Sequence, residues 1–344
     1  MTARTDLVGV IEAAYRLDLS DQEWLSAVVR AAGPHFDQGN GVYGFCFDAS
    51  QADQFRLWGT VVPDNALVIP ELIEKWHAAL DPDQIWRMYR GPLQFASISQ
   101  RLGGAELEMD QQAMQRFCRR IGVIDQLTLR GVDPTYRGVA VCTPLGDAAP
   151  PKPQDAGLWT RIAAHLSAGF RLRRYLAEAS ASEPSNLADR ADAVCELGGK
   201  VVSASNDATG NEARTSLHDA VVAIDRARSK LRRDDPEQAV EVWRGLVSGT
   251  WTLVEHFESD GRCYLLAMKN TPGTQDPRAL TERERQAIHY ATLGHSTKET
   301  AYALGISDHT VDVHLASAMK KLGIKSRIEL IRLMSGSTLS SSRS

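Results

Sequence analysis

The sequence has little of what a membrane-spanning or secreted protein needs. Nowhere do about twenty apolar residues follow one another, the length that a transmembrane helix requires. The first residues, Met1 to Leu7, lack the basic start, apolar centre and small-residue cleavage site of a secretory signal. We therefore expect no membrane partner and a cytoplasmic location.

Cysteine is also scarce and is spread along the chain. The five cysteines are Cys46, Cys118, Cys142, Cys195 and Cys263. No two of them have a CxxC or another metal-like spacing, so we expect reduced thiols, no metal site and no cofactor.

The motifs of common enzyme classes are missing too. The chain contains no GxSxG elbow, no HExxH, no Walker P-loop and no GxGxxG after a strand. Its N-terminal region also lacks an apolar strand that ends in paired aspartates, as a phosphorylated receiver domain would have. We therefore expect neither an enzyme nor control by phosphoryl relay.

Charge is distributed unevenly along a chain whose net charge is -4. Of the 39 Lys/Arg and 43 Asp/Glu residues, ten and seven respectively fall from Gln275 onward, so this last part is basic and the rest is acidic. Such an asymmetry is typical of a DNA-binding module joined to a region with another task.

Composition divides the 344 residues into several units, as the length also suggests. Two stretches rich in Ser, Pro, Gly or Asn, at 177–186 and 270–277, mark boundaries. The predicted units are a sensory domain at 1–180, a smaller domain at 187–270, a DNA-binding domain at 276–335 and a disordered tail at 336–344.

The pattern before residue 270 predicts an α+β fold with antiparallel sheets. Helical periodicity covers about 5–16, 21–32, 66–80 and 107–121, and Gly157–Leu176 reads as one long helix suited to pairing with a second copy. Strand-like runs are Val42–Phe47, Phe55–Val61, Val123–Leu129 and Gly138–Thr143. The smaller unit shows strands at 193–197 and 201–203, helices at 211–233 and 237–247, and a hairpin of 251–257 with 262–268 around Asp-Gly.

The C-terminal segment carries a series of helix-start signals. Thr281 with Glu284, Ser296 with Glu299, and Ser326 with Glu329 each have the spacing of a capping box. A fourth start is expected at Ser307, after a Leu-Gly-Ile turn. The sequence therefore predicts an all-α domain of four helices.

The helix after Ser307 has two faces. Val311, Leu315, Ala318 and Leu322 lie on one stripe at helical spacing and should be buried. The opposite side is expected to enter the DNA major groove, where base edges present distinct donors, acceptors and methyl groups. The candidate DNA-binding residues are Lys298, Ser307, His309, Thr310, Asp312, Val313, His314, Ser317, Lys320 and Lys321. Among them the lysines, with Lys325 and Arg327, are expected to contact phosphates.

This segment resembles the LuxR-type (NarL/FixJ-type) DNA-binding domain over about the last sixty residues. The family pattern is met at Leu280, Thr281, Arg283, Glu284, Gly294, Ser296, Lys298, Glu299, Ala301, Leu304, Ile306, Ser307, Thr310, Val311, His314, Lys321, Leu322 and Arg327. The resemblance implies a four-helix helix-turn-helix domain that binds double-stranded DNA as a homodimer, with the final helix, about 326–334, in the dimer contact.

Two positions depart from the family pattern. Asp312 stands where the family commonly has a lysine that faces the groove, and Ala316 stands at another position that is basic in some members. An acidic side chain near phosphates weakens non-specific binding, although Asp312 could accept from cytosine and Val313 could contact a thymine methyl. The alternative is an interaction protein whose helical module no longer binds DNA.

The N-terminal region offers weaker signals. Its order of elements resembles a GAF-type sensory domain followed by a PAS-type fold, and Trp76 to Pro82 resembles the acyl-homoserine-lactone receptors over a short stretch. Candidate residues that line a pocket for a small molecule are Trp58, Trp76, Trp86, Tyr89 and Phe95. Ordinary core packing of these aromatic rings is the alternative.

Overall fold

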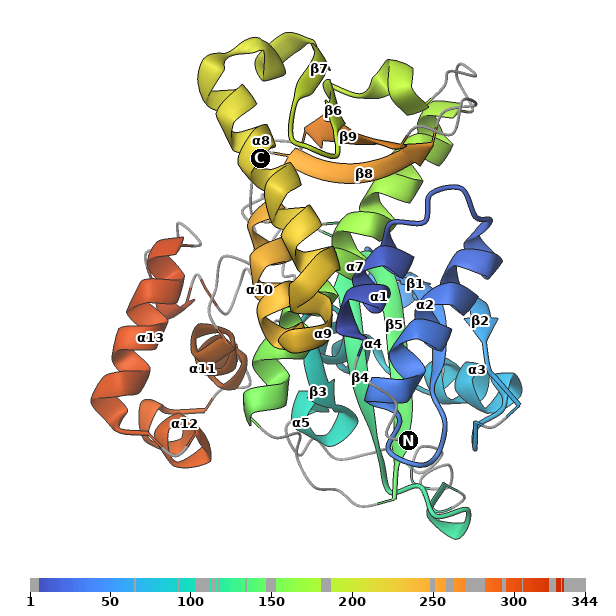
Figure 1. Cartoon of the computed structure of the whole chain (residues 1–344). Helices are drawn as coiled ribbons and strands as arrows, with labels where there is room; N and C mark the ends of the chain where they lie inside the picture. Colours follow the sequence, from blue (N-terminus) through green and yellow to red (C-terminus); the bar gives the residue numbers. More distant parts are fainter. Residues whose placement is uncertain are drawn as a thin grey trace, which may run out of the picture.

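The protein is a mixed α and β structure with two antiparallel sheets and a separate group of C-terminal helices (Figure 1). The computed structural model describes residues 6–64, 66–91, 93–102, 112, 116, 118–133, 135–146, 153–180, 187–247, 251–257, 263–269, 282–292, 295–304, 306–321, 326–328 and 330. The predicted tail at 336–344 and most of the predicted helix at 107–121 lie outside the described residues. We call the part from residue 6 to residue 269 the body.

The first sheet has five antiparallel strands in the order β2-β1-β5-β4-β3. Its strands are β1 (Tyr43–Asp48), β2 (Arg56–Val61), β3 (Phe95–Ser97), β4 (Asp125–Val132) and β5 (Arg137–Leu145). Four of these strands were predicted from apolar runs. The fifth, β3, has only three residues, too few for alternation to show, and it is defined instead by its pairing with β4.

Helices cover both faces of this sheet. On one face lie α1 (Leu7–Ala14), α2 (Asp21–Phe36) and α7 (Pro153–Ser180), which form one apolar cluster with the strands. On the other face lie α3 (Pro70–Ala78), α4 (Pro82–Ile85), η2 (Trp86–Arg90) and α5 (Ile98–Leu102), which enclose a second cluster. A short helix η1 (Ala52–Gln54) joins β1 to β2. Strand alternation explains the division, since Phe45 and Phe47 turn to the second cluster and Cys46 to the first.

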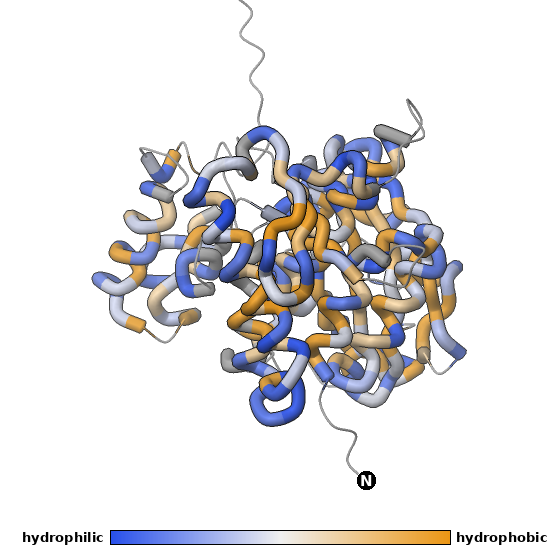
Figure 2. Tube along the Cα trace, turned by 45° about the horizontal axis from the view of Figure 1, so that its top comes forward, coloured by the Kyte–Doolittle hydropathy of each residue, from blue (hydrophilic) through white to orange (hydrophobic). Residues whose placement is uncertain are grey.

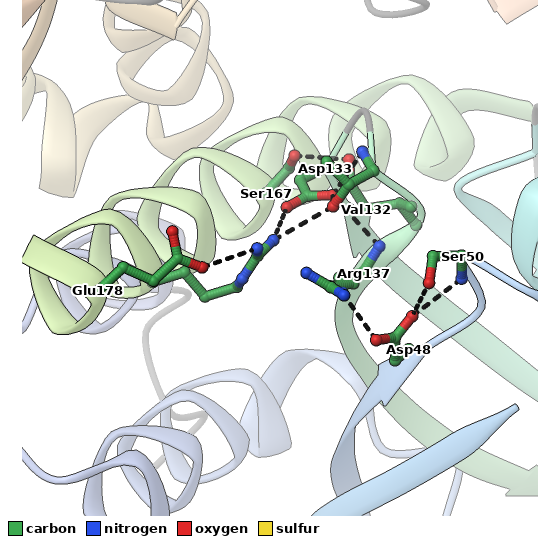
Figure 3. Close-up of polar contacts among 9 residues, drawn as sticks. Asp48, Ser50, Val132, Asp133, Arg137, Ser167 and Glu178 are labelled. Carbon is green, nitrogen blue, oxygen red and sulfur yellow. Dashed lines mark hydrogen bonds and ion pairs between the residues drawn. The ribbon is translucent and has the colours of Figure 1, made fainter. Parts of the chain in front are cut away.

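The long helix α7 is fixed tightly across the sheet. A Cβ at Gly131 on β4 would lie 2.6 Å from the Leu166 side chain, so only glycine allows this close approach. Near its C-terminal end Arg174 donates to Asp133 at 2.6 Å and to Glu178 at 3.1 Å, while the Ser167 hydroxyl donates to the Val132 carbonyl at 2.6 Å (Figure 3). The helix predicted at 157–176 is therefore present and longer at both ends.

The second sheet has four antiparallel strands in the order β7-β6-β9-β8. They are β6 (Ala193–Glu196), β7 (Val201–Ala204), β8 (Trp251–Phe257) and β9 (Cys263–Lys269). The predicted hairpin is confirmed as the β8–β9 pair. The accompanying helices are η3 (Leu187–Arg190), η4 (Asn206–Thr209), α8 (Asn211–Arg226), η5 (Ala227–Leu231), α9 (Arg232–Asp234) and α10 (Pro236–Val247).

The two sheets belong to one continuous apolar core. The cluster that holds Ile162 and Leu166 of α7 also holds Trp243 of α10 and Leu265 of β9. Ion pairs join the same two parts, since Arg232 contacts the Asp6 carboxylate at 2.7 Å. In Figure 2 the apolar residues gather along the strands inside the body, and hydrophilic residues occupy its outer turns.

The described residues contain neither a helix long and apolar enough to cross a membrane nor a group of three or more side chains placed to hold a metal ion.

Candidate nucleic-acid interface

The described residues of the C-terminal unit include three helices of eight residues or more. They are α11 (Glu282–Thr292), α12 (Thr297–Leu304) and α13 (Asp308–Lys321). Their buried apolar side chains are Ala287, Ile288, Ala291, Ala301, Val311, Leu315 and Ala318, joined by Leu330 from beyond α13. Residues 327, 328 and 330 are helical after Ser326, so the start of the predicted fourth helix is described and the rest lies outside the described residues.

Side-chain caps fix where α12 and α13 begin. Ser296 and Glu299 form the predicted reciprocal pair, with the Ser296 N–H donating to Glu299 at 2.7 Å and the Glu299 N–H donating to the Ser296 hydroxyl at 3.3 Å. These bonds hold the pKa of the Glu299 carboxyl below its usual value. The Ser307 hydroxyl accepts from the Thr310 N–H at 3.2 Å, so the helix start expected at Ser307 is confirmed. Thr281 and Glu329, the other predicted capping positions, lie outside the described residues.

The two faces of α13 are arranged as the periodicity predicted. Val311, Leu315 and Ala318 are buried, whereas the Val313 side chain is 51% exposed and Lys320 is exposed. Leu322, the fourth member of the predicted stripe, lies outside the described residues. In Figure 1 α11 lies between α13 and the body, and α11 contacts both α13 and α7. Helix α13 is therefore on the side of the unit that faces away from the body.

The candidate side chains on this face do not all point outward. Lys298, Ser307, His309, Asp312, Val313 and Lys320 are exposed, while Thr310, His314 and Ser317 are half-buried. For Lys321 only the backbone is described.

Three polar side chains have partners that sequence reasoning missed. The Ser317 hydroxyl donates to the buried Glu284 carboxylate at 2.6 Å, which directs it toward α11. The Thr297 hydroxyl donates to Asp312 at 3.2 Å, which links the start of α12 to the exposed face of α13. Arg327, expected to contact phosphate, donates to the backbone carbonyl of His295. Pairs such as these join residues on different helices, so no spacing within one helix reveals them.

The five aromatic residues proposed for a small-molecule pocket are not brought together. Phe95 packs against Phe36 and Trp159 on the face of the first sheet that α7 covers. Tyr89 lies on the opposite face, in ring contact with Phe47 and Phe55. The sheet itself separates them, because side chains on opposite faces of a sheet cannot line one cavity.

The three tryptophans of that set lie on three different elements. Trp58 is 39% exposed on the edge strand β2, opposite Cys46. Trp76 belongs to α3 and Trp86 to η2, and both are half-buried. For Phe95 and Tyr89 the structure thus supports the alternative of core packing.

Comparison with known proteins decides the family. Residues 278–334 match the family described as bacterial regulatory proteins, luxR family. The spore germination protein GerE of Bacillus subtilis (strain 168) is 41% identical over 63 residues, which cover 17% of this chain and 85% of GerE. The chain belongs to the luxR family of bacterial regulatory proteins.

The curated relatives match only a part of this chain. The transcriptional regulatory protein UhpA of Escherichia coli (strain K12) is 45% identical over 82 residues, which cover 23% of this chain and 41% of UhpA. The chain thus spans about two fifths of the length of that relative. A crystal structure of Escherichia coli SdiA covers 93% of this chain at 11% identity with a TM-score of 0.25, and a score this low carries no conclusion. UhpA bears the name of a transcriptional regulatory protein, and the family is described as regulatory proteins, not as enzymes.

Proposed function

We propose that the chain is a transcriptional regulator of the luxR family that acts in the cytoplasm, reads double-stranded DNA with α13 and is controlled by a signal sensed in the body. The observation that carries this proposal is the division of α13 between a buried Val311–Leu315 face and an exposed face with Val313 and Lys320. An exposed helix of this kind has the size and shape that the major groove admits.

Roles follow from the chemistry of the exposed side chains. We assign contacts with DNA phosphates to Lys298, Lys320 and Lys321. Such contacts supply affinity with little sequence preference. His309, Asp312 and Val313 are placed at base edges, since they share the outward side of α13. Ser307 and Thr310 hold the start of the helix, through the bond from the Thr310 N–H to the Ser307 hydroxyl. We place His314 at the border of the core and assign Ser317 to positioning, through its bond with Glu284.

We further propose that the regulator is a homodimer. Two copies of α13 must lie about one helical turn of DNA apart to read adjacent half-sites. Ile328, at the start of the fourth helix, is 64% exposed and supports a contact between copies there. The body, through the contact of α7 with α11, is in position to set the distance between the two recognition helices.

The test compares substitutions of different kinds on the purified full chain. Lys320→Ala should weaken binding to all DNA sequences alike and reduce the salt slope by about one counterion. Val313→Ala should change which sites are selected from a random DNA pool. A two-fold-symmetric motif in the wild-type selection would support the proposal.

The alternative is an interaction protein whose helix-turn-helix has lost DNA binding. The exposed Asp312 carboxylate favours it, because a negative charge on the groove face repels phosphates. Absence of any enriched motif at moderate salt, with the chain folded, would support this alternative and overturn the regulator proposal.

A further inference from the structure

A large cavity opens in the body between helices that cover the first sheet and the second sheet with its helices. Its volume is about 1000 Å³, at the upper end of the range of small-molecule sites, about 300–1,000 Å³. Both parts of the body line it, with α1, the residues after α1 and α7 on one side and α8, η5, α10, β8 and β9 on the other. In Figure 1 α1, α7 and α10 lie side by side below β8. We call this space the seam cavity.

One wall of the seam cavity is apolar and rigid. Leu253 and Leu265 project from adjacent strands of the second sheet, and Ile224 and Trp243 from α8 and α10. All four side chains belong to the continuous core and are at most 4% exposed. On the other side, Leu17 and Leu176 are half-buried and face the same space. Such a wall suits the apolar body of an organic molecule.

The rest of the lining is charged, and its charges balance. The lining contains three guanidinium groups, of Arg16, Arg190 and Arg228, and three carboxylates, of Glu12, Asp18 and Glu255. Arg228 contacts Glu12 at 3.1 Å and Glu255 at 3.0 Å and lies 5.2 Å above the Trp243 ring. Arg16 contacts Asp18 at 2.8 Å. A ligand with a net charge would have to break one of these pairs or lie beside an unmatched charge.

We propose that the seam cavity is an effector site for a net-neutral amphiphilic small molecule. Its apolar body packs against the half-buried Leu17 and Leu176 side chains, beside the Leu253–Leu265 wall, and its polar end hydrogen-bonds the Arg228–Glu12–Glu255 cluster. The role as effector site rests on the proposed function of the chain as a regulator. Its position supports that role, because Leu176 of α7 lines the cavity and α7 also contacts α11 of the DNA-binding unit. A molecule that changes how the two parts of the body meet therefore acts on the helix next to the DNA-binding unit.

The test uses two probes that share one ring system. N-phenyl-1-naphthylamine is uncharged, and 8-anilino-1-naphthalenesulfonate is the same molecule with an added sulfonate. The full chain should bind the uncharged probe at least about tenfold more tightly, the equivalent of 1.4 kcal/mol. Equal or tighter binding of the sulfonate would overturn the assignment of a net-neutral ligand.

A pair of variants locates the bound probe. Leu176→Trp places a larger side chain in the cavity, where it competes with the ligand for space, and should weaken binding of the uncharged probe by at least about fivefold, or 1 kcal/mol. The same substitution at Leu197, which is 45% exposed and outside the lining, should leave binding unchanged. Leu17→Trp, from the segment after α1, is the second variant if Leu176→Trp fails to fold. Probe binding that no lining variant weakens would overturn the site.

DNA binding is measured on the same samples. If probe binding follows these expectations but the chain binds no DNA, the seam cavity is supported as a ligand site and the proposed function is overturned. If the chain binds DNA and lining variants leave probe binding intact, the function stands and the seam cavity is not its effector site.

Discussion

The C-terminal unit and the body both build amphipathic helices around an apolar core, but they differ in how strongly a binding partner would constrain their residue spacing. The unit of α11, α12 and α13 has a small core and an exposed helix face, which under the proposed function must match the fixed dimensions of a DNA groove. The body has a far larger core around two sheets, and its cavity, as proposed, has to fit only one ligand. Because every DNA duplex has the same groove dimensions, proteins that read it share residue spacings. A small-molecule ligand differs from one protein to another, so it imposes no residue spacing that unrelated sequences would share.

The two regions also differ in where they keep charge. In the body, Arg101 and Arg130 are each 1% exposed, and both donate to backbone carbonyls, among them those of Thr128 at 2.9 Å and Gly91 at 2.8 Å. Burial lowers the pKa of Arg101 to about 10 and also lowers that of Arg130. In the C-terminal unit the lysines of the proposed interface that are described with their side chains, Lys298 and Lys320, are exposed. The two buried arginines of the body thus bind its own backbone, whereas Lys298 and Lys320 of the C-terminal unit stay at the surface.

The largest expected effect comes from a charged side chain placed in the apolar core of the C-terminal unit, and it tests whether that unit and the body unfold independently. Val311→Asp should lower the free energy of unfolding of the C-terminal unit by more than about 4 kcal/mol, because a carboxylate would be buried without a partner. DNA binding should then be lost while the body keeps its own melting transition. Calorimetry of the full chain and a gel-shift assay would measure both effects.

The matched control is the same substitution two residues away. Val313 is 51% exposed, so Val313→Asp should leave both transitions in place and weaken only DNA binding. If Val311→Asp melted the body as well, the two regions would form one cooperative unit and the comparison would fail.

A second prediction concerns acid and the body alone. His77 is buried, its Nδ1–H donates to the Ile73 carbonyl at 2.6 Å and its Nε2 accepts from the Tyr89 hydroxyl. Burial lowers the pKa of His77 from 6.5 to about 4. Between these pH values the unfolded chain binds a proton that the folded chain does not. The contribution of His77 to the stability of the body should therefore fall by about 3 kcal/mol as the pH drops from 6.5 to 4 and level off below.

His77→Gln removes the titrating group and keeps a donor for the Ile73 carbonyl. Denaturant unfolding of the wild type and the variant between pH 7 and pH 4 should give stability curves that diverge, with the steeper slope in the wild type. Parallel curves would show that His77 is not held neutral.

The elements that could be predicted from the sequence are those that short-range sequence patterns determine. Apolar runs predicted four of the five strands of the first sheet, and Asp-Gly predicted the β8–β9 hairpin. Spacing predicted the start of α13 at Ser307 and the buried face with Val311 and Leu315. Each of these features depends on neighbours a few residues apart in the chain.

What escaped prediction depends on residues that are distant in the chain. The bond of Ser317 with Glu284 and that of Asp312 with Thr297 join different helices. The aromatic residues were grouped by nearness in sequence, yet the sheet places Tyr89 and Phe95 on opposite faces. The seam cavity likewise exists only because two predicted units pack together, so no single segment contains its signature.

A third prediction uses the capping box, a helix-start motif that both regions contain, and expects a smaller effect on stability. The Ser20–Glu23 capping box starts α2 in the body, and the Ser296–Glu299 box starts α12. Ser20→Ala and Ser296→Ala should each cost about 1 kcal/mol. Because a small domain has a smaller entropy of unfolding, the melting temperature should fall by about 4–8 °C for the C-terminal unit and by about 2–4 °C or less for the body. Equal shifts in a two-transition calorimetric scan would mean that the regions do not melt separately.

The smallest expected effect lies on the recognition face itself. Asp312 accepts a hydrogen bond from Thr297 and, in the proposed complex, places a negative charge near the DNA phosphates. Asp312→Asn keeps an acceptor for the Thr297 hydroxyl and removes the charge, so affinity for random-sequence DNA should rise about twofold to threefold at low salt, roughly 0.5 kcal/mol. The gain should vanish as salt is raised, since screening removes what repulsion remains, and fluorescence anisotropy across a salt series would record it. A gain that persists at high salt would instead point to a new base contact. No gain at any salt would place Asp312 away from the DNA, and the exposed face of α13 would lose its assignment as the reading surface.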